Sequence, residues 1–176
     1  YTSGHSTRVA EYAVMIAKRL GYDKDHLREL FYMGLLHDVG KISVPDEIIN
    51  KPGKLTSTEY DIVKTHTVVG GKMLEKISTL PQLFLGAMYH HEKFDGKGYP
   101  EGLVGDNIPT DVRILSVADS YDAMASSRSY RGVLPQAVIR AELLKGKGTQ
   151  FDPVIADIMI ELIDEDVNFE LKEKNI

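Results

Sequence analysis

The stretch Leu36-His37-Asp38-Val39-Gly40-Lys41-Ile42 joins the apolar end of a predicted helix to a histidine, an aspartate and a lysine. An ionised carboxylate among aliphatic neighbours costs several kcal/mol unless a cation compensates it. A bound metal ion would remove that cost at Asp38, and so would an ion pair with a basic side chain such as Lys41. The stretch therefore predicts a helical protein with either a metal site or a buried ion pair.

Histidines and aspartates on both sides of this stretch favour the metal site. Taken singly, a histidine or aspartate on an apolar helix face is more often a hydrogen-bonded core residue than a ligand. Imidazoles and carboxylates together suit divalent first-row transition metals, and seven such groups exceed the three or four that one catalytic ion takes. The set predicts two ions rather than one. Its members, in chain order, are His5, His37, Asp38, His66, His90, His91 and Asp119.

The composition limits the class of protein. A chain of 176 residues with 43% hydrophobic content fits a single domain over residues 1–176. The net charge of −5 and the lack of a Lys/Arg run argue against binding to a nucleic acid polymer. Without cysteine, the metal ligands must be nitrogen and oxygen atoms. The apolar runs are too short to predict a membrane contact, and the start at Tyr1 without Met predicts a piece excised from a longer protein.

Apolar residues recur at helical spacing along most of the chain and predict an all-α, compact bundle of about seven helices. Asp25 is the expected N-cap of the second helix, and Thr56 and Glu59 form the expected capping box of the third. Tyr60 belongs to the apolar stripe of that third helix, beside His66. Prolines and glycines predict loops and short turns near residues 45–53 and 94–109. The expected helices span residues 5–21, 25–40, 56–69, 83–92, 112–125, 135–145 and 152–163.

The order of these ligands, joined to the segment His91-Glu-Lys-Phe-Asp-Gly-Lys-Gly-Tyr-Pro100, resembles the HD-GYP domains, a branch of the HD metal-dependent phosphohydrolases. The resemblance covers about residues 4–135, and the helices expected over 135–165 follow it. It implies an HD-domain fold with a non-haem di-iron or other two-metal centre. It also implies hydrolysis of the bacterial second messenger cyclic di-GMP to pGpG and/or GMP by a hydroxide that bridges the two metals.

The resemblance assigns the site residues position by position. Asp38 is expected to bridge the two ions. Some relatives add a glutamate four residues before the first histidine and hold three metals, but here that position is Tyr1, so two ions are expected. Iron is the first expectation, with manganese, nickel and zinc as alternatives. The basic HD set corresponds to His5, His37, Asp38 and Asp119, and the ligands added in HD-GYP proteins correspond to His66, His90 and His91.

Asp38 and Lys41 are the expected catalytic residues. Lys41 would lie near the phosphate, or would simply be a cation at a helix C-terminus. The glycine-rich loop would bring Tyr99 to the substrate, or would be a tight turn only. His26, outside the series, is expected to be an exposed surface residue. The predicted substrate contacts are Lys41, Tyr99, Asp122, Arg128 and Arg131, with solvation as the alternative for the arginines.

Two other functions fit the same residues. One is a phosphodiesterase of another cyclic dinucleotide, such as cyclic GMP-AMP. The other is a signalling module that binds a nucleotide or a partner protein with little turnover. The resemblance implies a cytoplasmic bacterial protein, in which this domain would be the output of a larger sensor or response regulator. The sequence makes no prediction of oligomeric state.

Overall fold

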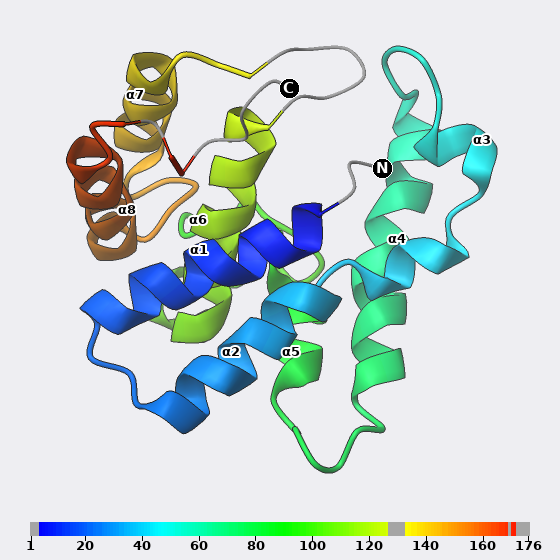
Figure 1. Ribbon diagram of the computed structural model, residues 1–176. Coiled ribbons are helices and arrows are strands. Elements are labelled where there is room, and N and C mark those ends of the chain that lie inside the picture. The colour runs from blue at the N-terminus through cyan, green and yellow to red at the C-terminus, as the bar shows by residue number, and fades with distance from the viewer. Residues whose placement is uncertain (1–3, 127–132, 169, 172–176) are drawn as a thin grey trace.

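The computed structural model describes residues 4–126, 133–168 and 170–171 of the chain (Figure 1). Over these residues it contains eight α-helices, two short 3-10 helices and no strand beyond isolated bridges. The all-α prediction is confirmed. No helix in the described part combines the length and the apolar character that crossing a membrane requires. The α-helices are α1 (His5–Arg19), α2 (Lys24–Leu36), α3 (Asp46–Ile49), α4 (Ser57–Leu74), α5 (Leu83–Tyr89), α6 (Thr110–Ala125), α7 (Gln136–Gly146) and α8 (Pro153–Glu165), and the 3-10 helices are η1 (Val39–Ser43) and η2 (Gly105–Asn107).

Helix starts follow the predicted capping chemistry, with one correction. Thr56 and Glu59 form the expected reciprocal capping box of α4. The N-cap of α2 is Asp23 rather than Asp25, because the Asp23 carboxylate accepts the backbone N–H of His26 at 2.9 Å. The four-residue α3 lies where only loops and short turns were predicted, since a single turn after a proline has no periodicity to reveal it.

Two helices end earlier than predicted, and both ends belong to the site described below. The helix α2 ends at Leu36 and not near residue 40, and η1 continues the chain after a change of direction at Asp38. The helix α5 ends at Tyr89 and not at Glu92, with His90 as its C-cap. Both histidine-bearing segments therefore lie where a helix unwinds.

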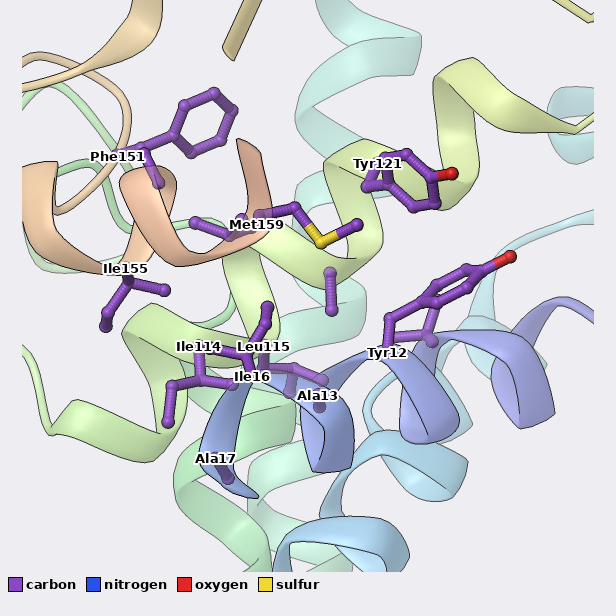
Figure 2. Close-up of a cluster of buried hydrophobic side chains, with 14 of the residues drawn as sticks. Tyr12, Ala13, Ile16, Ala17, Ile114, Leu115, Tyr121, Phe151, Ile155 and Met159 are labelled. Atoms are coloured by element: carbon purple, nitrogen blue, oxygen red, sulfur yellow. The ribbon is translucent and has the colours of Figure 1, made fainter. Parts of the chain in front are cut away.

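The hydrophobic core lies between α1, α6 and α8 (Figure 2). Ile16 of α1, Leu115 of α6 and Met159 of α8 are each at most 1% exposed. Each aliphatic side chain buried in this way contributes about 1.5–3 kcal/mol relative to exposure. The rings of Tyr12 and Tyr121 meet edge to face, with centroids 4.8 Å apart. This packing holds the middle of α1 against the C-terminal half of α6.

A glycine sets the distance between η1 and α4. A Cβ atom added to Gly40 would lie 1.9 Å from the carbonyl oxygen of His66 and 2.6 Å from the backbone nitrogen of Gly70. No larger residue fits there without moving one backbone away from the other. The approach places Asp38, two residues before Gly40, beside His66.

Candidate metal centre

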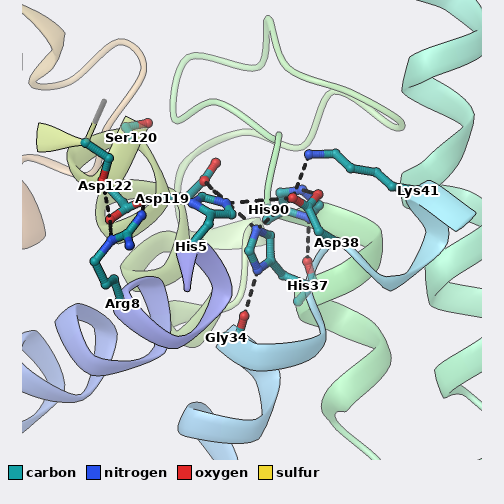
Figure 3. A network of polar contacts seen from close by, with 12 residues as sticks. His5, Arg8, Gly34, His37, Asp38, Lys41, His90, Asp119, Ser120 and Asp122 are labelled. Carbon is teal, nitrogen blue, oxygen red and sulfur yellow. Dashed lines mark hydrogen bonds and ion pairs between the residues drawn. The ribbon is translucent and has the colours of Figure 1, made fainter. Parts of the chain in front are cut away.

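The seven predicted ligands, from five separate segments, lie together in one cluster. His5 begins α1, His37 and Asp38 follow α2, His66 lies on α4, His90 and His91 follow α5, and Asp119 lies on α6. Figure 3 shows five of these side chains around the end of α2. Ligand atoms within 4.8 Å of one another define three groups: His66, His90 and His91; His5, His37 and Asp119; and His37, Asp38 and His90.

Asp38 lies between two sets of histidines. Its Oδ2 is 3.3 Å from His37 Nε2 and 3.8 Å from His5 Nε2. Its Oδ1 is 3.4 Å from His66 Nε2 and 3.7 Å from His90 Nε2. One oxygen of this carboxylate thus faces each set of histidines.

Each side of Asp38 has a third donor. Asp119 Oδ1 lies 3.3 Å from His5 Nε2 and 3.9 Å from His37 Nε2. His91 adjoins His90, with ring centroids 4.1 Å apart, and lies 5.3 Å from the ring of His66. We refer to His5, His37 and Asp119 as the His5 group and to His66, His90 and His91 as the His66 group.

Hydrogen bonds fix the orientation of the histidine rings. In His37, His66 and His90 the Nδ1 atom lies 2.7, 2.6 and 2.8 Å from a backbone carbonyl three or four residues earlier. A carbonyl only accepts, so each Nδ1 carries the proton and each Nε2 of a neutral ring presents a lone pair. All three lone pairs face the space around Asp38, which is the orientation that metal ligation requires.

The lone pairs need a cation. His66 Nε2 and His90 Nε2 lie only 3.4 Å apart, so two acceptors face each other. His37 Nε2 is buried and has no hydrogen-bond partner among the described residues. A divalent ion satisfies such atoms, and a buried acceptor that stays unsatisfied is costly. The His/Asp cluster therefore fits a divalent metal centre.

The two groups differ in electrostatics. Burial lowers the pKa of His66 to about 4 and that of His91 to about 2, so both rings are neutral at pH 7. Burial also opposes the charged form of His5, but hydrogen bonds to Asp119 and Asp122 and the charges of both carboxylates raise its pKa to about 9. His66 and His91 can therefore bind a cation at pH 7 without losing a proton, whereas His5 first has to lose one.

Asp122 lies behind His5 and not in the cavity, which corrects its predicted role as a substrate contact. Its side chain is 1% exposed, and its Oδ2 lies 2.7 Å from His5 Nδ1. Its Oδ1 accepts hydrogen bonds from Arg8 Nε at 2.6 Å and from Ser126 Oγ at 3.0 Å. A carboxylate held in this way has no lone pair directed at a ligand and instead orients the ring of His5.

Lys41 lies at the cluster with its Nζ 2.6 Å from Asp38 Oδ2 (Figure 3). The ion pair that the opening stretch suggested between Asp38 and Lys41 is therefore present. Asp38 also faces the histidines that could hold a metal. Lys41 also lines a cavity of about 310 Å³ beside the His66 group.

The cavity has an aromatic wall that sequence analysis identified only in part. The ring of Tyr99 stacks on that of His91, with centroids 4.8 Å apart and planes at 27°. Tyr60 lies edge-on to Tyr99 at 6.4 Å, and 47% of it is exposed. Sequence analysis counted Tyr60 in an apolar stripe, and only its position one and a half turns before His66 on α4 hinted at the site. Ser120 and Gln150 also line the cavity and were missed.

Three remaining predictions fall elsewhere. Arg128 and Arg131 lie in residues 127–132, outside the described residues. The first three residues, which include Tyr1, are also outside them. His26 is only partly exposed, because its Nε2 lies 2.8 Å from Asp111 Oδ2 and its ring stacks on Tyr22, so its prediction as a plain surface residue was incomplete.

The model of one protein family, the HD domain, matches residues 1–155, which include all seven candidate ligands. The chain belongs to the HD domain family. Its fold agrees with solved structures of similar proteins. A structure described as that of a cyclic GMP-AMP-specific phosphodiesterase of V. cholerae, V-cGAP3, matches with a TM-score of 0.70 at 21% identity over 97% of this HD domain and 46% of that chain. Bd1817, described as a HDG"Y"P protein from Bdellovibrio bacteriovorus, matches with a TM-score of 0.75 at 21% identity. The match covers 92% of this HD domain and 52% of that chain.

Curated relatives share more sequence with this HD domain. A "Probable cyclic di-GMP phosphodiesterase" of Vibrio cholerae is 36% identical over 98% of this chain and 42% of its own. The cyclic di-GMP phosphodiesterase response regulator RpfG of Xanthomonas campestris is 37% identical over 90% of this chain and 43% of its own. The "3'3'-cGAMP-specific phosphodiesterase 3" of V. cholerae is 40% identical over 87% of this chain and 33% of its own. The HD domain thus spans less than half the length of these relatives, and the resemblance to HD-GYP domains is confirmed.

Proposed function

We propose that this HD domain is a metal-dependent phosphodiesterase that hydrolyses cyclic di-GMP to pGpG and/or GMP. The position of Asp38 carries the proposal, since each of its two oxygens faces one group of histidines at 3.3–3.8 Å. The similarity to cyclic di-GMP phosphodiesterases supports the choice of substrate.

The His5 group would hold one ion and the His66 group another, and Asp38 would serve both. The donors are imidazole nitrogens and carboxylate oxygens, which iron, manganese, nickel and zinc all accept, and the resemblance to HD-GYP domains puts iron first. Two such ions, when bound, neutralise phosphate charge and lower the pKa of a water toward neutrality, so the protein needs no nucleophile of its own. Asp38 and Asp119 supply two negative charges that hold the ions, and the pKa of each is kept well below its usual range by the histidines, against the effect of burial.

Lys41 is placed to act on the phosphate. Its Nζ contacts Asp38, and Lys41 lines the cavity, so its charge can bind a non-bridging phosphate oxygen. The same Nζ carries a proton that it can donate to the departing 3′ oxygen. Asp38 orients the ammonium group for either role.

The aromatic wall can bind a base of the substrate. Tyr60 and Tyr99 line the cavity with the His66 group, and aromatic rings stack on nucleobases without regard to their identity. Ser120 and Gln150 add polar groups, and Gln150 Nε2 donates to Ser120 Oγ at 3.3 Å. An amide side chain can hydrogen-bond to a base edge.

The test is turnover of cyclic di-GMP by protein prepared without air, with the products separated by chromatography. We expect pGpG and/or GMP from the wild-type protein and neither from Asp38→Ala. Asp25→Ala is the matched control, because the Asp25 side chain is 81% exposed and outside the site. Metal-loaded wild-type protein that leaves every cyclic dinucleotide intact would contradict the proposal and favour a module that only binds a nucleotide or a partner protein.

The second candidate substrate is 3′3′-cyclic GMP-AMP, because relatives specific for it are as similar to this chain as those that act on cyclic di-GMP. Turnover of the two substrates in one mixture compares their kcat/KM values directly. We expect cyclic di-GMP to be consumed faster. A cytoplasmic location, the single domain over residues 1–176 and a link to signalling partners stay predictions.

A further inference from the structure

Glu92 is a buried carboxylate that has no role yet in the metal centre or among the predicted site residues. It follows His91 directly and is 2% exposed. Its Oε1 accepts the backbone N–H groups of Glu101 at 2.8 Å and Gly102 at 3.1 Å, and its Oε2 accepts that of Leu103 at 3.0 Å. Three amides on one carboxylate make a strong, charge-assisted anchor.

The loop that these amides belong to folds back over the end of α5. It closes at its base, where Asp95 and Val104 form a bridge and Gly105 N donates to the Phe94 carbonyl at 2.9 Å. Near its middle, a Cβ atom on Gly98 would lie 2.5 Å from the Cα of Glu92. The backbone of the loop at Gly98 therefore packs directly against the backbone of Glu92, next to His91.

The loop also carries Tyr99, whose ring stacks on His91. The backbone N–H of Tyr99 donates to the His91 carbonyl at 3.3 Å, and the ring centroids are 4.8 Å apart. Glu92 binds the loop directly after this point, at residues 101–103. The segment that carries Tyr99 is therefore bound at two places, to His91 at Tyr99 and to Glu92 at residues 101–103. These contacts fix the position of the Tyr99 ring relative to His91.

We propose that Glu92 is a positioning residue that fixes Tyr99 against His91 and so gives the substrate cavity its aromatic wall. The role in catalysis rests on the proposed phosphodiesterase function, whereas the placement of the loop does not. Glu92 also borders the cavity, but both of its carboxylate oxygens accept amides of the loop, so it acts through Tyr99.

The chemistry distinguishes glutamate from its closest analogue. In Glu92→Gln the amide oxygen can still accept from Glu101 and Gly102, but the NH₂ group would face the N–H of Leu103. Leaving one such donor unpaired lowers the closed-to-open equilibrium constant of the loop by about tenfold or more. A substrate that binds only the closed loop then shows an apparent affinity reduced by up to the same factor, in proportion to the closed population that is lost.

The test is a double-mutant cycle between Glu92→Gln and Tyr99→Ala, with kcat, KM and metal content measured for each variant. We expect Glu92→Gln alone to raise KM by up to about tenfold with two metals retained. In the Tyr99→Ala background it should have no further effect on KM, because the ring that it positions is gone. Glu101→Gln is the matched control: it removes an acidic side chain from the same loop, keeps the backbone N–H that Glu92 binds, and should leave KM unchanged. Additive effects, or an unchanged KM in Glu92→Gln, would overturn the inference.

A second readout does not depend on turnover. In zinc-loaded protein, NMR should show an Overhauser contact between the rings of Tyr99 and His91 and slow exchange of the amides of Glu101, Gly102 and Leu103. We expect Glu92→Gln to weaken the ring contact and to speed exchange at Leu103, and Glu101→Gln to change neither. Wild-type protein without turnover would refute the proposed function, and these spectra would still decide the role of Glu92. An intact ring contact and slow amides in Glu92→Gln would refute that role whatever the activity.

Discussion

Asp122 Oδ2 lies 2.7 Å from His5 Nδ1, across 117 positions of sequence. The contact joins the first helix to the sixth and directs His5 Nε2 toward Asp119 and Asp38. Carboxylates that contact a ligating histidine in this way fix its orientation and raise its basicity. Asp122 therefore supports the His5 group from outside it.

The first prediction concerns Asp122→Asn, which keeps the shape of the side chain and removes its charge. We expect affinity for the ion of the His5 group to fall by about 10- to 100-fold, with little change at the His66 group. Metal titration followed by elemental analysis would show one tight and one weakened site. Asp111→Asn is the matched control, because Asp111 contacts His26 at 2.8 Å outside the site. Equal weakening of both sites would contradict the assignment.

Lys41→Met tests whether the lysine acts on the phosphate. If Nζ donates a proton to the departing oxygen, kcat should fall by about 100-fold or more while both metals stay bound. The alternative is a cation at a helix end, and Lys72→Met is the control for it, since Lys72 lies in the last turn of α4. Comparable kcat values for the two variants would leave Lys41 without a catalytic role.

Substitutions at Tyr60 test the aromatic wall. Tyr60→Ala should raise KM by roughly 5- to 150-fold, because base stacking on an aromatic ring contributes about 1–3 kcal/mol. Tyr60→Phe keeps the ring and should stay close to wild type. Steady-state kinetics with cyclic di-GMP measure both. A phenylalanine variant as impaired as the alanine variant would show that the hydroxyl group, and not stacking, matters.

Metal binding should release a proton from His5 and none from His66. In metal-free protein at pH 7, His5 is protonated because its pKa is about 9, whereas His66 is neutral because its pKa is about 4. A cation at the His5 group must displace the His5 proton, and one at the His66 group displaces none from His66. Calorimetry of zinc binding in two buffers of different ionisation enthalpy counts the protons. Proton-free binding at both sites would contradict this difference.

The raised pKa of His5 also predicts how the stability of the metal-free protein changes with pH. Since its folded pKa exceeds the unfolded value of 6.5, its contribution is fully present below pH 6.5 and is lost as pH rises through about 9. Thermal unfolding in the presence of a chelator should therefore show a Tm that falls over this range. Asp122→Asn, which removes one of the carboxylates that raise the pKa, should flatten the slope. A slope as steep in Asp122→Asn as in wild type would assign it to other groups.

Sequence analysis named seven candidate ligands, and four of them lie in recognisable local patterns. His37 and Asp38 end an apolar helix, and His90 and His91 precede a glycine-rich loop, so neighbouring residues carry the signal. The capping box at Thr56 was equally local, and it was confirmed. Features of this kind depend on a few consecutive residues and can be predicted from them.

The features that were missed depend on contacts between distant residues. Asp122 follows Asp119 by three positions and therefore looked like a second group on the same ligand-facing side of α6. Its partners His5 and Arg8 are more than 110 positions away, and no spacing rule reveals them. Tyr60 looked like a core residue because an aromatic side chain fits an apolar stripe. Only the folded structure shows that Tyr60 and His66 of α4 line a cavity.

The central claim is that Asp38 is shared by two ions in a cyclic dinucleotide phosphodiesterase. The most direct measurement is elemental analysis of metal per chain in protein purified without air, paired with cyclic di-GMP turnover by the same samples of wild type and Asp38→Ala. We predict two metals per wild-type chain with turnover, and loss of both metal and turnover in Asp38→Ala. A single metal per active wild-type chain, or an Asp38→Ala variant that keeps two metals and full turnover, would contradict the account.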